Sequence, residues 1–209
     1  MKLKFIMALA VTLASCAASA QDALQLPAPD KSLPMTLMEA LQQRHSTWQH
    51  TDKPVSDAEL STILWAASGI NRPEDKRITA PSAVNAQDII IYVMRAEGTY
   101  IYDMENHALA KVNDKDLRGA VCGRDPQPVP APIMMLLVSD LNKFGGDSDF
   151  ARKMAPLDAG YVSENICLVC TALGLNTVPR MTMLYPVLKE ELGLSDIQLP
   201  LLNHPISKP

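Results

Sequence analysis

The sequence predicts an α+β fold. Two helical segments near the start are followed by three short strands, a buried strand and a long helix, with no alternation of strands and helices. The three short strands follow one another through tight turns, which favours an antiparallel meander. A chain of 209 residues, 47% of them hydrophobic, has the size of one globular domain with a substantial core.

The first twenty residues have the features of a secretory signal peptide and are expected to be absent from the mature fold. Lys2 and Lys4 give a positive start, and Phe5 to Leu13 form an apolar stretch too short to span a bilayer. Ala18-Ser19-Ala20 is a small-residue cleavage site. Residues 1–20 therefore predict export to the periplasm.

A second interpretation of the same region predicts a lipid anchor. Leu13-Ala14-Ser15-Cys16 resembles a bacterial lipobox, in which Cys16 is lipidated. Both interpretations predict export, and we favour the released form because the small residues continue past Cys16. No later stretch is long and apolar enough for a membrane span. The net charge of −4 provides no basic field for nucleic acid.

Residues 21–34 are rich in proline and alanine and lack periodicity, so they are expected to be a flexible tether before a domain at 35–209. Thr36 to Arg44 is predicted to be a helix because Leu37, Met38 and Leu41 share one face.

Ser56 and Glu59 have the spacing of a capping box, so a second helix is expected to begin there. Its apolar residues recur at helical spacing up to Ser68, and Gly69 is expected to end it. The following residues, 70–87, are polar and rich in turn formers and are expected to form a loop.

The middle of the chain has the pattern of a sheet. Strands are predicted at Ile89–Met94, Thr99–Asp103 and Ala108–Val112, with a short helix at Asp114–Val121. Ile133 to Val138 is continuously apolar, which indicates a central strand buried on both faces.

The last third begins with a long helix and ends in an extended tail. Asp147 to Leu173 is predicted to be mostly helical, with Gly174 at its end, and 186–193 to be a short helix. The tail, Leu199 to Pro209, is apolar and contains several prolines, a poor segment to leave in solvent.

The cysteines invite a redox or metal interpretation. Cys167 and Cys170 form a C-x-x-C within an apolar helical stretch, with no second such pair and no histidine near it. Packing within the core is the favoured interpretation. A disulfide between Cys122 and one of these residues stays open, because the sequence does not determine pairing.

Three clusters carry chemistry. Arg44-His45-Ser46 offers a guanidinium, an imidazole and a hydroxyl suited to a phosphate, although an ordinary polar helix end has the same residues. Ala80 to Gln87 combines small residues with amides that recognise the edge of a heteroaromatic ring, or forms a plain turn before a strand. Gly174 to Arg180 either terminates a helix or places backbone amides and an arginine beside a cofactor.

The order of these clusters resembles the FMN-dependent nitroreductase family, and is closest to its exported or SagB-like bacterial branch. The likeness runs from about Leu37 to the C-terminus. It rests on the arginine-histidine-serine triplet, the helix from Lys53 to Gly69, the hairpin around Tyr102, the helix ending at Gly174 and the tail. The loop preceding the first strand matches at Asn71, Arg72, Arg77, Pro81, Ser82, Asn85 and Gln87.

The resemblance implies a nitroreductase-like fold with a central, mostly antiparallel sheet flanked by helices. It also implies a homodimer with the flavin at the interface and the C-terminal tail exchanged onto the partner. Arg44 and Ser46 would hold the FMN phosphate, with His45 beside them. The loop residues Pro81, Ser82, Asn85 and Gln87 would line the flavin, from across a dimer interface.

The resemblance implies further cofactor contacts near the end of the chain. Backbone amides at Met181 and Thr182 would lie near the flavin N5, and Arg180 and Lys208 would add positive charge near the phosphate or the N1–C2 edge. The chain departs from the family pattern in three places. Trp48 replaces a basic residue, and the glycines common near Thr182 and near Ser207 are absent.

The implied activity is two-electron redox chemistry through FMN with a small-molecule donor, such as NAD(P)H, and an acceptor such as a nitroaromatic or a quinone. The reverse dehydrogenation is an alternative direction of the same chemistry. Two alternatives remain. One is a non-catalytic flavin-binding or storage protein, and the other is a thiol or metal protein built on the cysteines. No catalytic side chain and no metal ligand is predicted.

Overall fold

The computed structural model describes residues 23–123 and 131–209. Its centre is a six-stranded sheet in which all neighbours are antiparallel, with the order β1-β6-β5-β4-β7-β8. The strands are β1 (Ala23–Gln25), β4 (Ile89–Arg95), β5 (Gly98–Asp103), β6 (Ala108–Asn113), β7 (Ile133–Asp140) and β8 (Gln198–Ile206). The predicted signal peptide, Cys16 included, lies outside the described residues.

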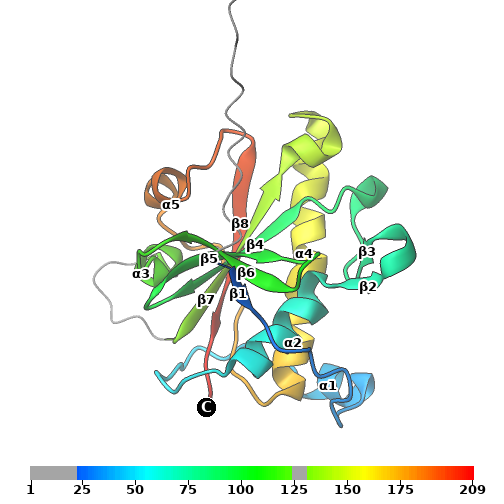
Figure 1. Ribbon diagram of the computed structural model, residues 1–209, viewed down its shortest axis with the longest axis vertical. Coiled ribbons are helices and arrows are strands. Elements are labelled where there is room, and N and C mark those ends of the chain that lie inside the picture. Colours follow the sequence, from blue (N-terminus) through cyan, green and yellow to red (C-terminus); the bar gives the residue numbers. More distant parts are fainter. Residues whose placement is uncertain (1–22, 124–130) are drawn as a thin grey trace, which may run out of the picture.

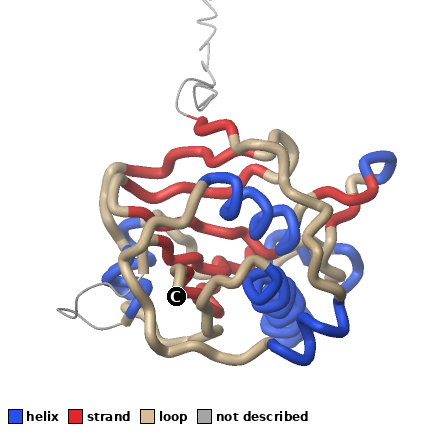
Figure 2. Tube along the Cα trace, turned by 90° about the horizontal axis from the view of Figure 1, so that it is seen from below, coloured by secondary structure: helices blue, strands red, loops and turns tan. Residues whose placement is uncertain are grey.

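Of the five α-helices in the described part of the chain, four cover the two faces of this sheet, and the first packs against the long helix α4 (Figures 1 and 2). Helices α2 and α4 pack on one face, and α3 and α5 on the other, so that the sheet is the middle of three layers. The helices are α1 (Leu37–Gln43), α2 (Asp57–Ser68), α3 (Arg118–Cys122), α4 (Asp149–Ala172) and α5 (Tyr185–Glu191). The α+β prediction and the antiparallel, helix-flanked sheet are confirmed.

Strand β7 shows why the middle of the sheet forms. Ile133, Met135 and Leu137 face the core under α2 and α4. The alternate residues of the strand face the second core, under α3 and α5. Because both faces are covered, the strand is continuously apolar instead of alternating with polar residues. The predicted buried central strand is therefore confirmed.

Local signals place the first two helices. Thr36 caps α1 in a capping box with Glu39, and Ser56 caps α2 in the same way with Glu59. The apolar face predicted for α1 is not buried, however. Leu37, Met38 and Leu41 are 64%, 72% and 49% exposed, and Ala40 is the buried residue of this helix.

The loop expected at 70–87 contains regular structure. β2 (Ile70–Arg72) and β3 (Arg77–Ile78) pair as a small antiparallel hairpin around a 3₁₀ turn at Pro73–Asp75. A second 3₁₀ turn, Ala83–Asn85, follows. Strands of two and three residues are too short to leave a periodic pattern in the sequence.

The expectation of a flexible tether at 21–34 is not met from Ala23 onward. β1 pairs with β6, and the backbone N–H of Leu26 donates to the carbonyl of His107 at 3.3 Å. The His107 ring contacts the Pro27 carbonyl and the Ser61 hydroxyl. The partners lie far along the chain, so the local composition that suggested a tether could not reveal them.

The buried Leu26 gives the first testable prediction. Its side chain is 4% exposed, whereas that of Leu24 is 38% exposed. Leu26→Ala is expected to lower the free energy of unfolding by roughly 2–4 kcal/mol, since it leaves a cavity. Leu24→Ala is the matched control and should cost less than about 1 kcal/mol. Chemical denaturation measures both, and equal small effects would show that this segment is a tether after all.

The C-terminal tail has its partner within the same chain. Residues 198–206 form β8, which pairs with β7 along its length and crosses a register shift near Leu137 and Val138. The resemblance implied an exchange of this tail onto a second subunit, and that exchange stays a prediction. Within the chain, the apolar strand completes the sheet, in agreement with the expectation that it avoids solvent.

Candidate functional site

Three segments that are distant in sequence meet near the end of α4. They are residues 44–51 after α1, the loop 174–182 and the end of β8 with the residues behind it. The N–H of Thr47 donates to the carbonyl of Thr177 at 3.0 Å. His50 Nδ1 lies 3.3 Å from the buried Ser207 hydroxyl. The arginine-histidine-serine segment, the Arg180 loop and the tail are therefore neighbours, as the family resemblance requires.

Arg180 is held in place by Asn203. Its Nε and Nη2 donate to Asn203 Oδ1 at 3.2 and 3.1 Å, and the two backbones pair in both directions. The Asn203 amide also donates to the Thr182 carbonyl at 2.9 Å. One buried side chain thus sets the position of the whole loop from Arg180 to Thr182, leaving the side chains of Met181 and Thr182 exposed.

His204, next along β8, is completely buried and neutral. Its Nε2 lies 2.8 Å from the Ser163 hydroxyl and its Nδ1 lies 3.1 Å from the Thr177 hydroxyl. Burial, together with the nearby charge of Arg180, lowers the pKa of His204 to about 3. The ring therefore ties α4 to the loop before Arg180 without adding charge to the site.

The predicted triplet lies at the rim of this region. Arg44 is paired loosely with Glu164 on α4, with an Nε–Oε1 distance of 3.9 Å, and both side chains are partly exposed. His45 lines a cavity of about 200 Å³ together with Asn176 and Thr177. Ser46 is exposed. These groups are accessible to a ligand, and Arg44 needs to give up only a weak ion pair to bind one.

Two further side chains, a histidine and a lysine, shape this end of the site. Burial lowers the pKa of His50, and the charge of Arg180 lowers it further. The Lys208 ammonium pairs with Glu59 Oε1 at 3.3 Å. The backbone carbonyl of Lys208 accepts a hydrogen bond from the Thr51 hydroxyl. Lys208 therefore reaches the capping box of α2, so that its charge is already engaged by a carboxylate.

The second predicted group forms a separate loop. Pro81 is exposed, and Ser82 Oγ accepts a hydrogen bond from the Gln87 N–H at 2.9 Å. The Gln87 amide donates to the Lys76 carbonyl at 3.0 Å and to Asn85 Oδ1 at 3.3 Å. Within the described residues, no hydrogen bond or ion pair joins this loop to the arginine-histidine-serine triplet.

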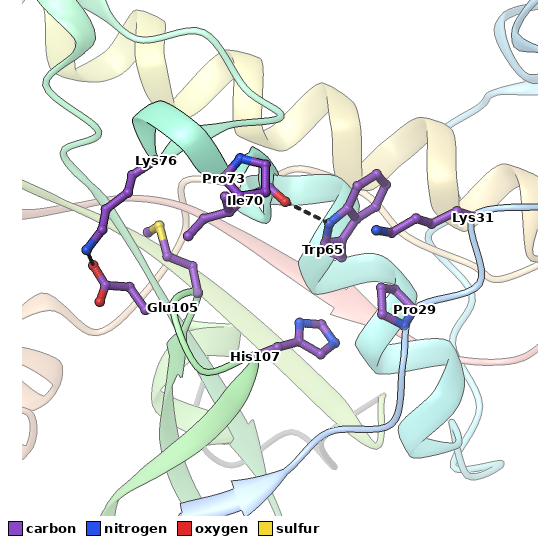
Figure 3. A pocket seen from close by; sticks show the side chains of 9 residues that line it. Pro29, Lys31, Trp65, Ile70, Pro73, Lys76, Glu105 and His107 are labelled. Atoms are coloured by element: carbon purple, nitrogen blue, oxygen red, sulfur yellow. Dashed lines mark hydrogen bonds and ion pairs between the residues drawn. The ribbon is translucent and has the colours of Figure 1, made fainter.

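A pocket of about 460 Å³ lies elsewhere, between the N-terminal segment and α2 (Figure 3). The Lys31 ammonium lies 4.4 Å from the centre of the Trp65 ring, a cation–π contact. Lys76 and Glu105 form an ion pair at another side. None of the predicted cofactor residues lines this pocket, so it is distinct from the candidate site.

The cysteines do not form a reactive centre. Cys122, Cys167 and Cys170 are free thiols, and no cluster of potential metal ligands occurs in the described parts of the chain. Burial raises the pKa of Cys167 to about 11 and that of Cys170 even further. A thiolate is thereby disfavoured, which supports the packing interpretation.

Alkylation with iodoacetamide at pH 8 tests this interpretation. Cys122, which is half-buried, should react first in the folded protein. Cys167 and Cys170 should react at least roughly tenfold more slowly, because little thiolate is present and access is poor. Peptide mass mapping of each cysteine gives the rates. Equal rates for all three would point to an exposed dithiol and revive the redox alternative.

Comparison with known proteins finds one family. The pattern of the nitroreductase family matches residues 41–206. A candidate nitroreductase of Methanocaldococcus jannaschii is 27% identical over 199 residues, which cover 90% of this chain and 98% of that protein.

Solved structures show the same likeness. The crystal structure of a candidate nitroreductase from Ralstonia eutropha superposes with a TM-score of 0.82 and 28% identity, covering 100% of this chain and 98% of the other. A chain of the Escherichia coli microcin synthetase complex shares the fold, with a TM-score of 0.71, 17% identity, and coverage of 80% and 69%.

The fold and these likenesses define the class of protein as a flavin oxidoreductase built on an α+β domain. The chain belongs to the nitroreductase family. No helix in the described part of the chain is long and apolar enough to cross a membrane.

Proposed function

We propose that the protein binds FMN and catalyses two-electron transfer between a reduced donor, such as NAD(P)H, and a nitroaromatic- or quinone-like acceptor, or the reverse dehydrogenation. The observation that carries this proposal is the convergence of Arg44, the Asn203-held Arg180 and the tail on one accessible region. These are the positions at which the family resemblance implies cofactor contacts.

The residues present fit a flavin nucleotide. Arg44 and the Ser46 hydroxyl offer an accessible cation and a donor for the terminal phosphate. Arg180, fixed by two hydrogen bonds to Asn203, offers a preorganised positive charge. When bound, FMN supplies hydride exchange at its N5 atom. The chain's own residues bind and orient the cofactor, and no protein acid or base is required.

Our proposal includes a homodimer. The arginine-histidine-serine triplet and the 81–87 loop are separate within one chain. Helix α4 contacts both, through Glu164 and Asp158, and an exposed apolar surface lies along α1 and α4. This surface, the α1/α4 face, comprises Leu37, Met38 and Leu41 of α1 with Leu157 and Tyr161 of α4, all 49–72% exposed. The two helices contact each other. An exposed apolar area of this kind is typical of a protein–protein interface.

Two finer features of the proposal concern lineage and location. The match of the arginine-histidine-serine triplet and of the Pro81-Ser82 loop supports placement in the SagB-like bacterial branch. The charged and apolar segments within residues 1–20 support export, with release into the periplasm favoured over an anchor at Cys16.

An absorbance spectrum of residues 21–209 tests the proposal directly. We expect flavin bands that survive desalting, or that appear after addition of FMN, and that bleach with NADH or NADPH. Bands that persist without bleaching by any reductant would favour the storage alternative. A colourless protein that ignores added FMN would refute the flavin proposal. Sedimentation of the same sample tests the dimer, and a monomer at micromolar concentration would contradict it.

A further inference from the structure

The loop after β3 has an unusual backbone. Val84, Asn85 and Gln87 have φ angles of 50°, 57° and 49°, so three residues with side chains adopt the left-handed region within four positions. This region is unfavourable for residues other than glycine, and most of all for a β-branched valine. Contacts outside the loop must therefore hold it in this shape.

One such contact comes from Asp158 of α4. Its side chain is buried, 2% exposed, and its two carboxylate oxygens accept the Ala83 N–H at 3.1 and 2.9 Å. The helix is thus hydrogen-bonded to the loop immediately before the strained residues. This attachment, the grip of α4 on the loop, depends on a single carboxylate as acceptor.

A second buried carboxyl group lies at the other end of the loop. Asp88 is 0% exposed, and the Ser139 hydroxyl donates to its Oδ2. Its Oδ1 has no hydrogen-bond partner among the described residues. The Asp88 and Asp158 side chains line the same small cavity. A hydrogen bond between their carboxyl groups requires a proton on one of them. The orphaned Oδ1 is the free oxygen available to carry it.

Among the described residues, none that lines this cavity offers a positive charge to the pair. β3, β4 and α4 contribute the apolar Ile78, Ile89 and Val162 to the same small cavity. The carboxylate of Asp140, at the end of β7, accepts the Asn142 N–H, and Arg77 of β3 pairs with Asp75.

Two ionised carboxylates in such surroundings repel each other and are poorly solvated. Burial is the main reason that the pKa of Asp88 rises to about 6. The Ser139 hydrogen bond opposes this rise, and Asp158 adds to it.

We propose that Asp88 and Asp158 are positioning residues that share one proton, and that the protonated pair holds the Ser82–Gln87 loop in the shape that receives the flavin. Protonated Asp88 donates to an oxygen of Asp158, whose side chain continues to accept the Ala83 N–H. When the proton leaves to solvent, the two charges repel and the grip on the loop loosens. The link to the flavin rests on the proposed function, whereas the shared proton does not.

The pH range follows from the direction of the shift. The folded pKa of Asp88, about 6, lies above the ordinary value of 3.8, so the folded protein binds the proton more tightly than the unfolded chain. The resulting stabilisation is fully present below about pH 3.8 and is lost as the pH rises through about 6. The loop should be held firmly at pH 5 and more loosely at pH 8.

Two variants and a control separate the possibilities. Asp88→Asn imitates the protonated state, because its amide donates to Asp158 and its carbonyl accepts from Ser139. Asp158→Asn removes the like charge while keeping an acceptor for Ala83, so it should lower the titration midpoint of Asp88. Asp196→Asn is the matched control, since that side chain is exposed and its ion-pair partner, Lys189, lies outside the Ser82–Gln87 loop.

The first measurement is an NMR titration of side-chain carboxyl carbons in the flavin-free protein. One carboxyl of the wild type should titrate near pH 6, and that transition should disappear in Asp88→Asn. Amide exchange of the Ala83–Gln87 loop, corrected for its intrinsic pH dependence, should become roughly tenfold faster from pH 5 to pH 8. It should stay constant within about twofold in Asp88→Asn. Midpoints below about pH 4.5 for both aspartates would overturn the inference.

FMN titrations at pH 5.5 and pH 8 connect the pair to the cofactor. The wild type should bind FMN more weakly at pH 8, and Asp88→Asn should bind equally well at both values. Binding of FMN without a carboxyl transition near pH 6 would refute the shared proton and leave the proposed function standing. A carboxyl transition near pH 6 in a protein that never binds FMN would support the shared proton and refute the proposed function.

Discussion

Replacing Arg44 with alanine is expected to weaken FMN binding by roughly 100-fold. A hydrogen bond to a charged group contributes about 1.5–3 kcal/mol, and each 1.4 kcal/mol corresponds to a factor of ten in affinity. Arg44 is the accessible cation of the triplet, and its guanidinium can donate two parallel hydrogen bonds to a phosphate. Quenching of flavin fluorescence on titration with protein measures the dissociation constant.

The folded state should tolerate this change. The ion pair of Arg44 with Glu164 is long, at 3.9 Å, and its side chains are 37% and 51% exposed, so it contributes little to stability. Arg152→Ala provides a control of equal charge, because Arg152 pairs with Asp147 at the start of α4. An affinity of the Arg44 variant within about threefold of the wild type would show that the phosphate binds elsewhere.

The second large effect is a loss of folding stability at acidic pH. His204 has a folded pKa of about 3, below the ordinary value of 6.5, so the folded protein resists protonating it. The stability that His204 contributes is complete above about pH 6.5 and declines as the pH falls toward 3. At about 1.36 kcal/mol per pH unit, roughly 3 kcal/mol is lost between pH 6.5 and pH 4.

This loss must be measured as a difference between proteins. Asp88 acts in the opposite direction over nearly the same range, since its protonation stabilises the fold. His204→Gln removes the histidine titration alone, and His45→Gln is the exposed control. Urea unfolding at fixed protein concentration should show wild type and His204→Gln converging as the pH falls. A difference between them that stays constant from pH 7 to pH 4 would contradict the prediction.

Much of the fold was predictable because its strongest signals are local. The Ser56–Glu59 capping box placed α2, and the unbroken apolar run of β7 showed a strand covered on both sides. The N-terminal segment and α1 were harder. Leu26 is buried by partners distant in sequence, whereas the apolar stripe of α1 is exposed in a single chain. Periodicity identifies an apolar face but not what covers it.

The site was predictable where a motif exists and obscure where single buried polar residues do the positioning. The arginine-histidine-serine triplet and the Pro81-Ser82 loop stand out in the sequence. Asn203 and His204 had one weak signal, two consecutive polar residues in an apolar tail. Asp88 and Asp158 had none, because their pairing depends on how α4 crosses the loop.

The last strand of the sheet carries a further consequence. β8 lies at one edge and contains Pro200 and Pro205, residues without an N–H to offer a neighbouring strand. The opposite edge is β1, which spans three residues and is followed by Pro27. Both rims of the sheet are thus poor templates for adding strands from another molecule. Amyloid-like stacking is discouraged, and self-association is left to the α1/α4 face.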